Sequence, residues 1–314
     1  MKFTLHIVRL VPMASPNFRT DFEPRYGECV ALAPGISRIT CNNPSPFTFH
    51  GTNTYLLGTD DLAIIDPGPE NDEHFQALEK AIGNRTVSKI IITHTHADHS
   101  PLAARLAEET GAQTVAEGSH RPARALHIGE SNPLDASADR EFAPDITVSH
   151  GDIVEGDGWS LTTLLSPGHT ANHASFALNG TDHLFSGDHV MAWATSIVAP
   201  PDGAMSDYMR SLDIMLEQSQ SVYFPGHGGR LTNAHQFVRA LRTHRKMRET
   251  AVLDQIVKGQ RTIPEMVAII YRNTDKRLHG AAGLSVMAHL EDLVARGVVA
   301  TDGHVSIDGE YHPA

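Results

Sequence analysis

Four side chains that can bind a metal ion lie within the seven residues Thr93–His99. They follow the apolar run Ile90–Ile92, which predicts a buried strand. In an extended chain, residues two apart point to the same side, so His94 and His96 can reach one ion together. The spacing therefore predicts a metal site directly after this strand.

The next residues predict how the rest of the cluster is placed. Ser100 is a favourable helix N-cap, and Pro101 is favourable at the first helical position. A turn into a helix here lets Asp98 and His99 aim at a point beside the first pair. The site would then lie at the carboxyl end of a strand, where open α/β sheets usually bind ligands. Imidazole and carboxylate groups suit zinc, and iron and manganese also accept them.

Three further candidate ligands, His169, Asp188 and His227, each follow a predicted strand and lie beside glycine or proline. These small or cyclic neighbours let the backbone turn tightly and approach an ion. A single tetrahedral ion needs fewer ligands than the chain offers. The surplus favours a site for two ions.

The ordered ligand set resembles that of the metallo-β-lactamase superfamily, and Ile65–Gly68 resembles the family's first motif. The segment Asn43–Leu56 is similar to the entry segment of the β-lactamase-like protein subgroup, which includes an endoribonuclease. The resemblance spans nearly the whole chain. It implies an α/β fold, namely an αββα sandwich over residues 1–234, followed by a helical linker and a small winged-helix-like domain over residues 235–314.

The resemblance also implies a role for each ligand and two metal ions per chain, with zinc expected and iron or manganese as alternatives. The implied ligands are His94, His96 and His169 for the first ion, Asp98, His99 and His227 for the second, and Asp188 as the bridge. Asp66 would orient a ligand histidine. Asp98 would be the catalytic residue, which orients a metal-bridging hydroxide and later moves a proton.

Departures from related patterns narrow the chemistry. Asp188 occupies the place of a cysteine in the commonest β-lactamases, while Cys29 and Cys41 lie upstream of every motif. His96 stands where the redox di-iron branch carries glutamate, which favours hydrolysis. Only 38 residues separate Asp188 from His227, too few for the extra domain of the large RNA-processing nucleases.

Other patterns predict the elements around the site. A short strand should end at Asp66, and a helix should run from a cap at Asn71 or Asp72 to a stop at Gly83. Gly111 should end the helix after the histidine cluster. The pair Asn179-Gly180 predicts a β-hairpin with a tight primed turn.

The C-terminal region predicts helices near 233–258, 262–271 and 281–296, then a hairpin that pairs 298–300 with 304–307. This order is typical of a winged helix. Since the last ligand precedes this region, we expect the hydrolytic machinery to be complete without it.

The charge of the C-terminal region is a weak signal for nucleic acid. Residues 235–314 hold 11 Lys and Arg against 9 Asp and Glu, a net +2, while the whole chain carries −12 and residues 1–234 therefore −14. An acidic body repels phosphate at long range. We interpret the basic residues of the first helix as a solvated face. They are Arg239, Arg242, Arg245, Lys246 and Arg248.

Two segments are candidates for the substrate pocket. Trp193, Tyr208 and Arg210 follow the bridging aspartate closely, and we expect them to contact substrate. The irregular segment 117–145 is expected to form a surface excursion near the site.

Length and composition bound the setting. The 314 residues suit one large and one small domain, and two cysteines are too few for a disulfide framework, which favours a reduced, cytoplasmic protein. The start, Met1–Arg9, is too short and interrupted for a secretory signal. No apolar stretch approaches the roughly 18 residues of a membrane span, so no membrane partner is expected.

Three functions remain open. The first is a di-metal hydrolase of a small ester, thioester or lactone. The second is a single-strand endoribonuclease, whose partner would be single-stranded RNA. The third is a nucleic-acid-binding regulator whose metal site senses a ligand. The metal ligands do not encode the leaving group.

Overall fold

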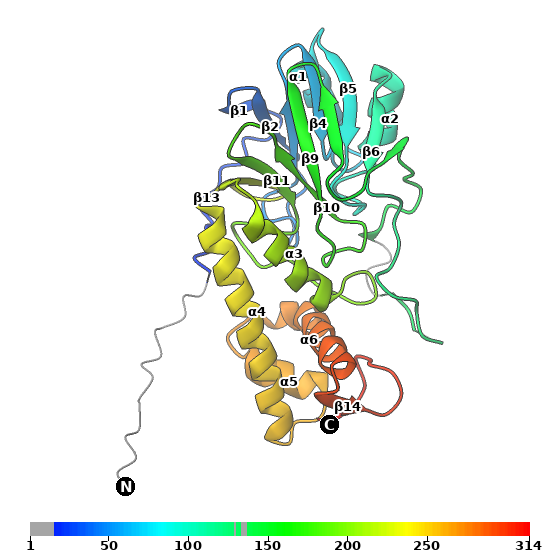
Figure 1. Ribbon diagram of the computed structural model, residues 1–314, viewed down its shortest axis with the longest axis vertical. Coiled ribbons are helices and arrows are strands. Elements are labelled where there is room, and N and C mark those ends of the chain that lie inside the picture. The colour runs from blue at the N-terminus through cyan, green and yellow to red at the C-terminus, as the bar shows by residue number, and fades with distance from the viewer. Residues whose placement is uncertain (1–15, 129, 133–136) are drawn as a thin grey trace.

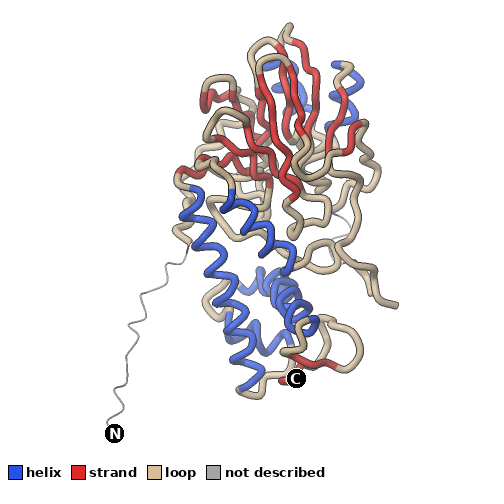
Figure 2. The backbone as a smooth tube through the Cα atoms, in the orientation of Figure 1, coloured by secondary structure: helices blue, strands red, loops and turns tan. Residues whose placement is uncertain are grey.

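The computed structural model describes residues 16–128, 130–132 and 137–314, so Met1–Arg9 and part of the segment 117–145 lie outside the described residues. A sandwich of sheets forms one end of the molecule, and a helical C-terminal region forms the other (Figure 1). Figure 2 shows the strands gathered in the first part and the longest helices in the second. The predicted α/β sandwich with a winged-helix-like C-terminal region is confirmed.

The first sheet contains seven strands among the described residues, in chain order. They are β1 (Val30–Ala33), β2 (Ile36–Thr40), β3 (Asn53–Leu57), β4 (Asp61–Ile65), β5 (Thr86–Ile91), β6 (Gln113–Ala116) and β7 (Ile146–Thr147). From β1 to β4 the neighbours are antiparallel, and from β4 to β7 they are parallel. Parallel neighbours need crossover connections. Two of these are helices, α1 (Asp72–Ile82) and α2 (Leu102–Thr110).

The ends of both helices follow from local chemistry. The Asn71 side chain accepts a hydrogen bond from the His74 N–H at 2.8 Å and so caps α1. Gly83 ends α1 with φ 61°, and Gly111 ends α2 with φ 72°, conformations that glycine adopts without steric cost. The predicted stops are confirmed.

The predicted N-cap of α2 is wrong. The Ser100 hydroxyl donates to Asp139 at 2.6 Å, and Pro101 is the N-cap residue of a helix that begins at Leu102. Ser100 is therefore engaged by the segment that precedes β7, a long-range contact that local spacing does not report.

The second sheet has the order β13-β12-β11-β10-β9-β8. Its strands are β8 (Ile153–Gly156), β9 (Trp159–Leu165), β10 (Ala174–Leu178), β11 (His183–Gly187), β12 (Val222–Pro225) and β13 (Leu231–Thr232). The β11–β12 pair is parallel, and α3 (Met205–Glu217) lies in its connection.

The predicted hairpin between β10 and β11 is confirmed, but its turn is not the two-residue primed type. Four residues, 179–182, connect the strands, and Gly180 has φ 74° whereas Asn179 has no positive φ. A type I′ turn needs positive φ at both central residues. The Thr181 hydroxyl donates to the Leu178 carbonyl at 2.9 Å and stabilises the longer loop.

Three apolar layers hold the sandwich together. Phe176, Phe185 and Phe224 of the second sheet pack between the sheets against Ile65 and Ile91 of the first. The helices α1 and α2 cover the outer face of the first sheet. The helix α3 and the start of α4 (Ala234–Val257) cover the second. This is the expected αββα order, and it holds the carboxyl ends of β4, β5, β11 and β12 beside one another.

The helix α4 takes part in two cores. Val238 and Leu241 near its start pack with α3, whereas Val252 and Ile256 near its end pack in the C-terminal core. The remaining C-terminal elements are α5 (Ile263–Ile270), the 3₁₀ turn η2 (Lys276–Leu278), α6 (His279–Ala295), β14 (Val299–Thr301) and β15 (Tyr311–Pro313). The division at 234/235 stays a prediction. None of the helices in the described ranges is long and apolar enough to cross a membrane.

The second strand of the C-terminal hairpin lies later than predicted. The strand β14 pairs with β15, and residues 304–307 form no strand. Tyr311 is fully buried, and its hydroxyl donates to the Ser306 carbonyl at 2.5 Å. Val305 is buried in the same core. Burial of Tyr311 therefore fixes the register, and the intervening residues form a loop over it.

Candidate metal centre

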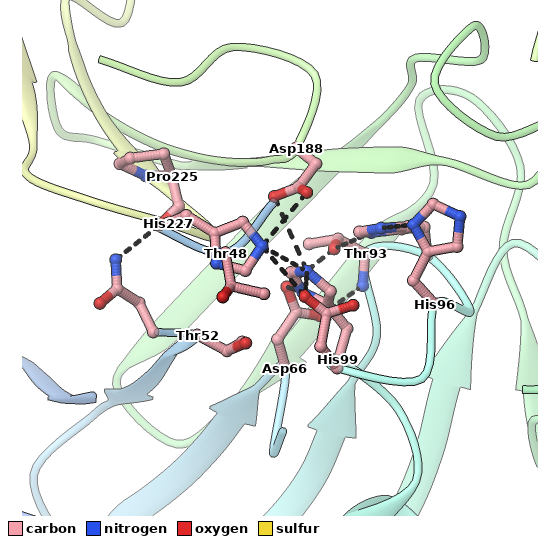
Figure 3. A network of polar contacts seen from close by, with 12 residues as sticks. Thr48, Thr52, Asp66, Thr93, His96, His99, Asp188, Pro225 and His227 are labelled. Atoms are coloured by element: carbon pink, nitrogen blue, oxygen red, sulfur yellow. Dashed lines mark hydrogen bonds and ion pairs between the residues drawn. The ribbon is translucent and has the colours of Figure 1, made fainter. Parts of the chain in front are cut away.

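Five segments converge where the two sheets meet. Asp66 follows β4, and the segment Thr93–His99 follows β5, while His169, Asp188 and His227 come from the loops after β9 or at the ends of β11 and β12. Figure 3 shows Asp66, Asp188 and His227 pointing toward one another from separate strands. The structure thus brings together all seven predicted ligands and Asp66.

The first group consists of His94, His96 and His169, all buried. The Nε2 atoms of His94 and His169 each lie 3.0 Å from Nδ1 of His96. Three imidazole nitrogens that converge in this way form a site of the kind that binds zinc.

The second group consists of Asp98, His99 and His227. A carboxylate oxygen of Asp98 lies 3.1 Å from His227 Nε2 and 3.5 Å from His99 Nε2. The two histidine Nε2 atoms are 3.3 Å apart. This group offers two nitrogens and one carboxylate oxygen to a second ion.

Asp188 lies between the groups. Its carboxylate approaches His227 Nε2 at 3.3 Å, His99 Nε2 at 3.7 Å and His169 Nε2 at 3.8 Å. Its Oδ1 atom is buried and has no hydrogen-bond partner among the described residues. A buried carboxylate oxygen needs a donor or a cation, so Asp188 fits a bridge between two metal ions.

The contacts of three ligand histidines fix which nitrogen faces the centre. Each Nδ1 atom contacts an oxygen that accepts hydrogen bonds and cannot donate one, so Nδ1 carries a proton and Nε2 is the nitrogen able to coordinate. The pairs are His99 with the Asp66 carboxylate at 3.0 Å, His169 with the Ile197 carbonyl at 2.6 Å, and His227 with the Gly51 carbonyl at 3.1 Å.

Asp66 holds the start of the ligand segment in place. Its carboxylate accepts hydrogen bonds from the Thr93 N–H and hydroxyl, both at 2.8 Å, as well as from His99. Asp66 has φ 51°, which turns its side chain back toward this segment after β4. The position agrees with its predicted role of orienting a ligand histidine.

Glycine is required where the ligands are most crowded. A Cβ atom at Gly226 would lie 2.5 Å from Asp188 Oδ1 and 2.6 Å from His99 Cε1. At Gly187, which has φ 48°, it would lie 2.6 Å from His173 Nε2. These contacts are too short for carbon, so a side chain at either position would displace a ligand or the ring beside it.

The first group is neutral near pH 7. Burial, followed by repulsion from His169, lowers the pKa of His96 to about 3. Burial is also the largest influence on His94 and His169, and it lowers both pKa values. These nitrogens can bind a metal ion without first losing a proton.

The second group attracts positive charge. Burial opposes protonation of His227, but the attraction of Asp188 and Asp98 outweighs it and raises its pKa to about 10. The pKa of His99 is likewise raised against burial by Asp98, Asp188 and Asp66. The same pairing lowers the pKa values of Asp98 and Asp188 although burial opposes this. A metal ion in this group would replace protons on histidine.

A cavity of about 710 Å³ opens onto the centre, and Asp98, His96, His169 and Asp188 lie in its wall. The Asp98 side chain is 26% exposed, whereas that of Asp188 is 8% exposed. Asp98 is thus the carboxylate that the cavity reaches most readily. Trp193 also lines this cavity, as predicted, and stacks on Phe49 with ring centroids 4.8 Å apart.

The other two predicted substrate contacts are wrong. Tyr208 is fully buried beneath the site, where its hydroxyl donates to the His189 carbonyl at 3.0 Å. Arg210 is exposed and pairs with Asp207. Both lie on α3, one on the face packed in the core and the other on the solvent face, and neither lines the cavity.

The sequence interpretation missed the contribution of the C-terminal region to this cavity. His244, Arg245 and Arg248 of α4 line it together with Tyr271 and residues of α6, so the cavity wall is not complete without this region, although all seven predicted ligands precede it. Arg245 also donates to the Ser196 carbonyl, next to the carbonyl that holds His169. The signal was present in the sequence, since arginines three apart share a helix face.

The described end of the segment 117–145 lies beside the ligand segment, as expected. The Ala97 N–H donates to the Ser137 carbonyl at 2.8 Å, and the Asp139 N–H donates to the Thr95 carbonyl at 2.9 Å. Ser137 also lines the cavity. This segment therefore braces the histidine cluster from one side.

Comparison with known families agrees with the fold and the ligand geometry. Residues 47–227 match the model of the metallo-β-lactamase superfamily, and residues 262–307 match the β-lactamase-associated winged helix domain. The chain therefore belongs to the metallo-β-lactamase superfamily and is a hydrolase of that fold.

Individual relatives cover most of the chain. A protein named β-lactamase-like protein 2 homolog from Drosophila melanogaster is 29% identical over 90% of this chain and 97% of its own. An atrochrysone carboxyl ACP thioesterase from Passalora fulva is 29% identical over 79% of this chain and 71% of its own. A β-lactamase domain protein of solved structure from Burkholderia ambifaria superposes with TM-score 0.77 at 21% identity, covering 94% of this chain and 96% of its own, which shows the shared fold.

The two ligand groups should respond differently to pH. The pKa of His227 is raised to about 10, so a metal ion that binds to its group must displace a proton. The apparent affinity of this group for the ion should therefore fall about tenfold, for each displaced proton, with every pH unit below about 10. The first group should change little from about pH 8 to 6, since its pKa values are lowered. Calorimetric Zn²⁺ titration in buffers of different ionisation enthalpy would count the protons. Equal release from both steps would contradict the assignment.

Asp66→Asn should weaken metal binding without unfolding the chain. The amide keeps the size of the side chain but cannot accept from all the groups that contact Asp66, so His99 loses its fixed orientation. Loss of such a partner lowers metal affinity about 10- to 100-fold. Competition with a chromophoric chelator measures this change. Asp72→Asn, an exposed side chain at the start of α1, is the control and should bind as the wild type does; equal affinity in both variants would show that Asp66 has no such role.

Proposed function

We propose that this protein hydrolyses a small ester, thioester or lactone at a centre that holds two divalent metal ions, with zinc as the expected metal. The observation that carries the proposal is the position of Asp188 between two ligand groups that open onto one cavity. His94, His96 and His169 would hold one ion, and the Asp98 group the other.

The cavity supports a small substrate. Its volume, about 710 Å³, lies within the roughly 300–1,000 Å³ typical of sites for small molecules. Its wall combines apolar groups such as Trp193 and Ile197 with the polar metal centre. An acyl chain can therefore lie along the wall while its carbonyl faces the ligands.

The residues of the centre have distinct tasks in this reaction. Paired metal ions lower the pKa of water and polarise the bond under attack. Asp98 is in reach of the cavity, so its carboxylate can orient the attacking water and accept or return a proton. Asp66 holds His99, and the Ile197 carbonyl holds His169, so the ligand rings need little rearrangement during the reaction.

The relatives give this proposal independent support, since one is named a thioesterase. Endoribonuclease activity is the competing proposal, but residues 1–234 carry −14 and the cavity has the size of a small-molecule site. A regulator with a sensing site would not need the complete ligand set. We retain the cytoplasm as the proposed compartment because both cysteines, Cys29 and Cys41, are free thiols.

A substrate screen with the metal-loaded protein tests the proposal. Turnover of an ester, thioester or lactone is expected, and Asp98→Asn should lower kcat at least about 100-fold because it removes a general base. Metal content measured in parallel separates loss of the base from loss of an ion. Asp157→Asn, in a surface turn, is the control. Cleavage of single-stranded RNA with no turnover of acyl substrates would contradict the proposal.

A further inference from the structure

The wall of the cavity contributed by the C-terminal region carries two guanidinium groups, those of Arg245 and Arg248. Among the described lining residues, the only carboxylates are Asp98 and Asp188, and both belong to the metal centre. Among the described residues, no carboxylate oxygen forms an ion pair within 4.0 Å of a guanidinium nitrogen of Arg245 or Arg248. The cavity thus has positive charge that the protein does not neutralise locally.

Three acidic side chains of the C-terminal region pair with other arginines and not with Arg245 or Arg248. The pairs are Glu249 with Arg296 at 2.7 Å, Asp275 with Arg277 at 2.6 Å, and Glu291 with Arg124 at 2.6 Å. The two arginines also affect His244. Its pKa is lowered to about 4, first by burial and then by repulsion from Arg245 and Arg248. His244 is therefore neutral at pH 7 and gives the cavity wall a hydrogen-bonding group without a charge.

The two arginines differ in what they can still bind. Arg245 is buried and donates hydrogen bonds to the Ser196 carbonyl and, at 3.3 Å, to the Ser285 hydroxyl. Its guanidinium therefore links parts of the protein to one another. Arg248 is half-buried and lies over the Tyr271 ring, with its guanidinium carbon 4.7 Å from the ring centre. Its Nε is buried and has no hydrogen-bond partner among the described residues. Stacking on Tyr271 fixes the guanidinium plane, and an arginine held in this way can bind a carboxylate or phosphate through its N–H groups.

The wall also has apolar groups contributed by both parts of the chain. Trp193 and Ile197 come from the sandwich, and Leu278 and Ala282 come from the C-terminal region. An aliphatic chain can pack against these groups. A ligand that uses the whole cavity would thus combine a carbonyl, an apolar spacer and an anionic group.

We propose that Arg248, held against Tyr271, binds an anionic group of the substrate, a carboxylate or a phosphate, while the ester, thioester or lactone carbonyl lies at the metal centre. The proposal rests on the hydrolase function proposed above and adds the substrate class, an acyl compound with an anionic end. Arg248 is then a specificity-determining residue supplied by the C-terminal region.

Equilibrium binding to the metal-free protein tests the anion site without any turnover. The probes are dimethyl suberate, monomethyl suberate and methyl 8-(phosphonooxy)octanoate, which share a similar chain length and differ in the terminal group. The wild type should bind at least one anionic probe about tenfold or more tightly than the neutral diester, and the preferred probe distinguishes carboxylate from phosphate. Equal affinity for all three would overturn the proposal, and this comparison needs no variant to fold.

Variants then locate the site. Arg248→Gln should abolish the preference for the anionic probe, and Arg248→Lys should restore part of it. Arg239→Gln, an exposed arginine of the same helix that does not line the cavity, should keep the full preference. A preference that survives in Arg248→Gln would overturn the assignment to Arg248.

Turnover separates this inference from the proposed function. With metal-loaded protein, Arg248→Gln should raise KM for the mono-p-nitrophenyl ester of suberic acid about tenfold, and change KM for p-nitrophenyl octanoate less than about twofold. An equal rise for both esters would overturn the anion site and leave the hydrolase intact. Hydrolysis of no acyl substrate by the wild type would contradict the hydrolase, while the binding experiment would still decide the anion site.

Discussion

The structure depends on three carboxylates that surround one buried histidine ring. Asp66, Asp98 and Asp188 all lie within 4 Å of His99, a residue with no exposed surface. Buried carboxylates repel one another and are stable only with protons or cations beside them. The aspartates raise the pKa values of His99 and His227, so protons on these two rings balance part of the negative charge. Two divalent ions would balance it more completely. The centre is thus built to hold positive charge.

The fold meets this demand by bringing strand ends from two sheets to one place. The inter-sheet core fixes the strands, so the ligand loops need not supply their own stability. Glycine at Gly226 and Gly187 allows the backbone to approach the ligands. The C-terminal region then completes the cavity, because α4 packs in both cores and presents Arg245 and Arg248 on the side that faces the centre.

The local sequence predicted correctly those features of the structure that depend on residues close together in the chain. The ligand spacing after a strand, the cap at Asn71 and the stop at Gly83 each involve neighbours in the chain, and all lie where predicted. Errors arose where distant contacts decide. Ser100 binds Asp139 in place of capping α2, and burial of Tyr311 moves the last strand. The placement of Tyr208 and Arg210 depends on how α3 packs on the second sheet, which a pattern in α3 alone does not report.

The most direct test of the account is the number of metal ions bound per chain. Wild-type protein loaded with Zn²⁺ and freed of excess metal should hold two ions by elemental analysis. Asp188→Ala should hold one at most, because both groups share this carboxylate. Asp182→Ala is the control, because Asp182 lies in the exposed loop before β11, the strand that Asp188 follows. This variant should hold two ions. A wild type that holds no metal, or an Asp188→Ala variant that still holds two ions with unchanged affinity, would contradict the central claim.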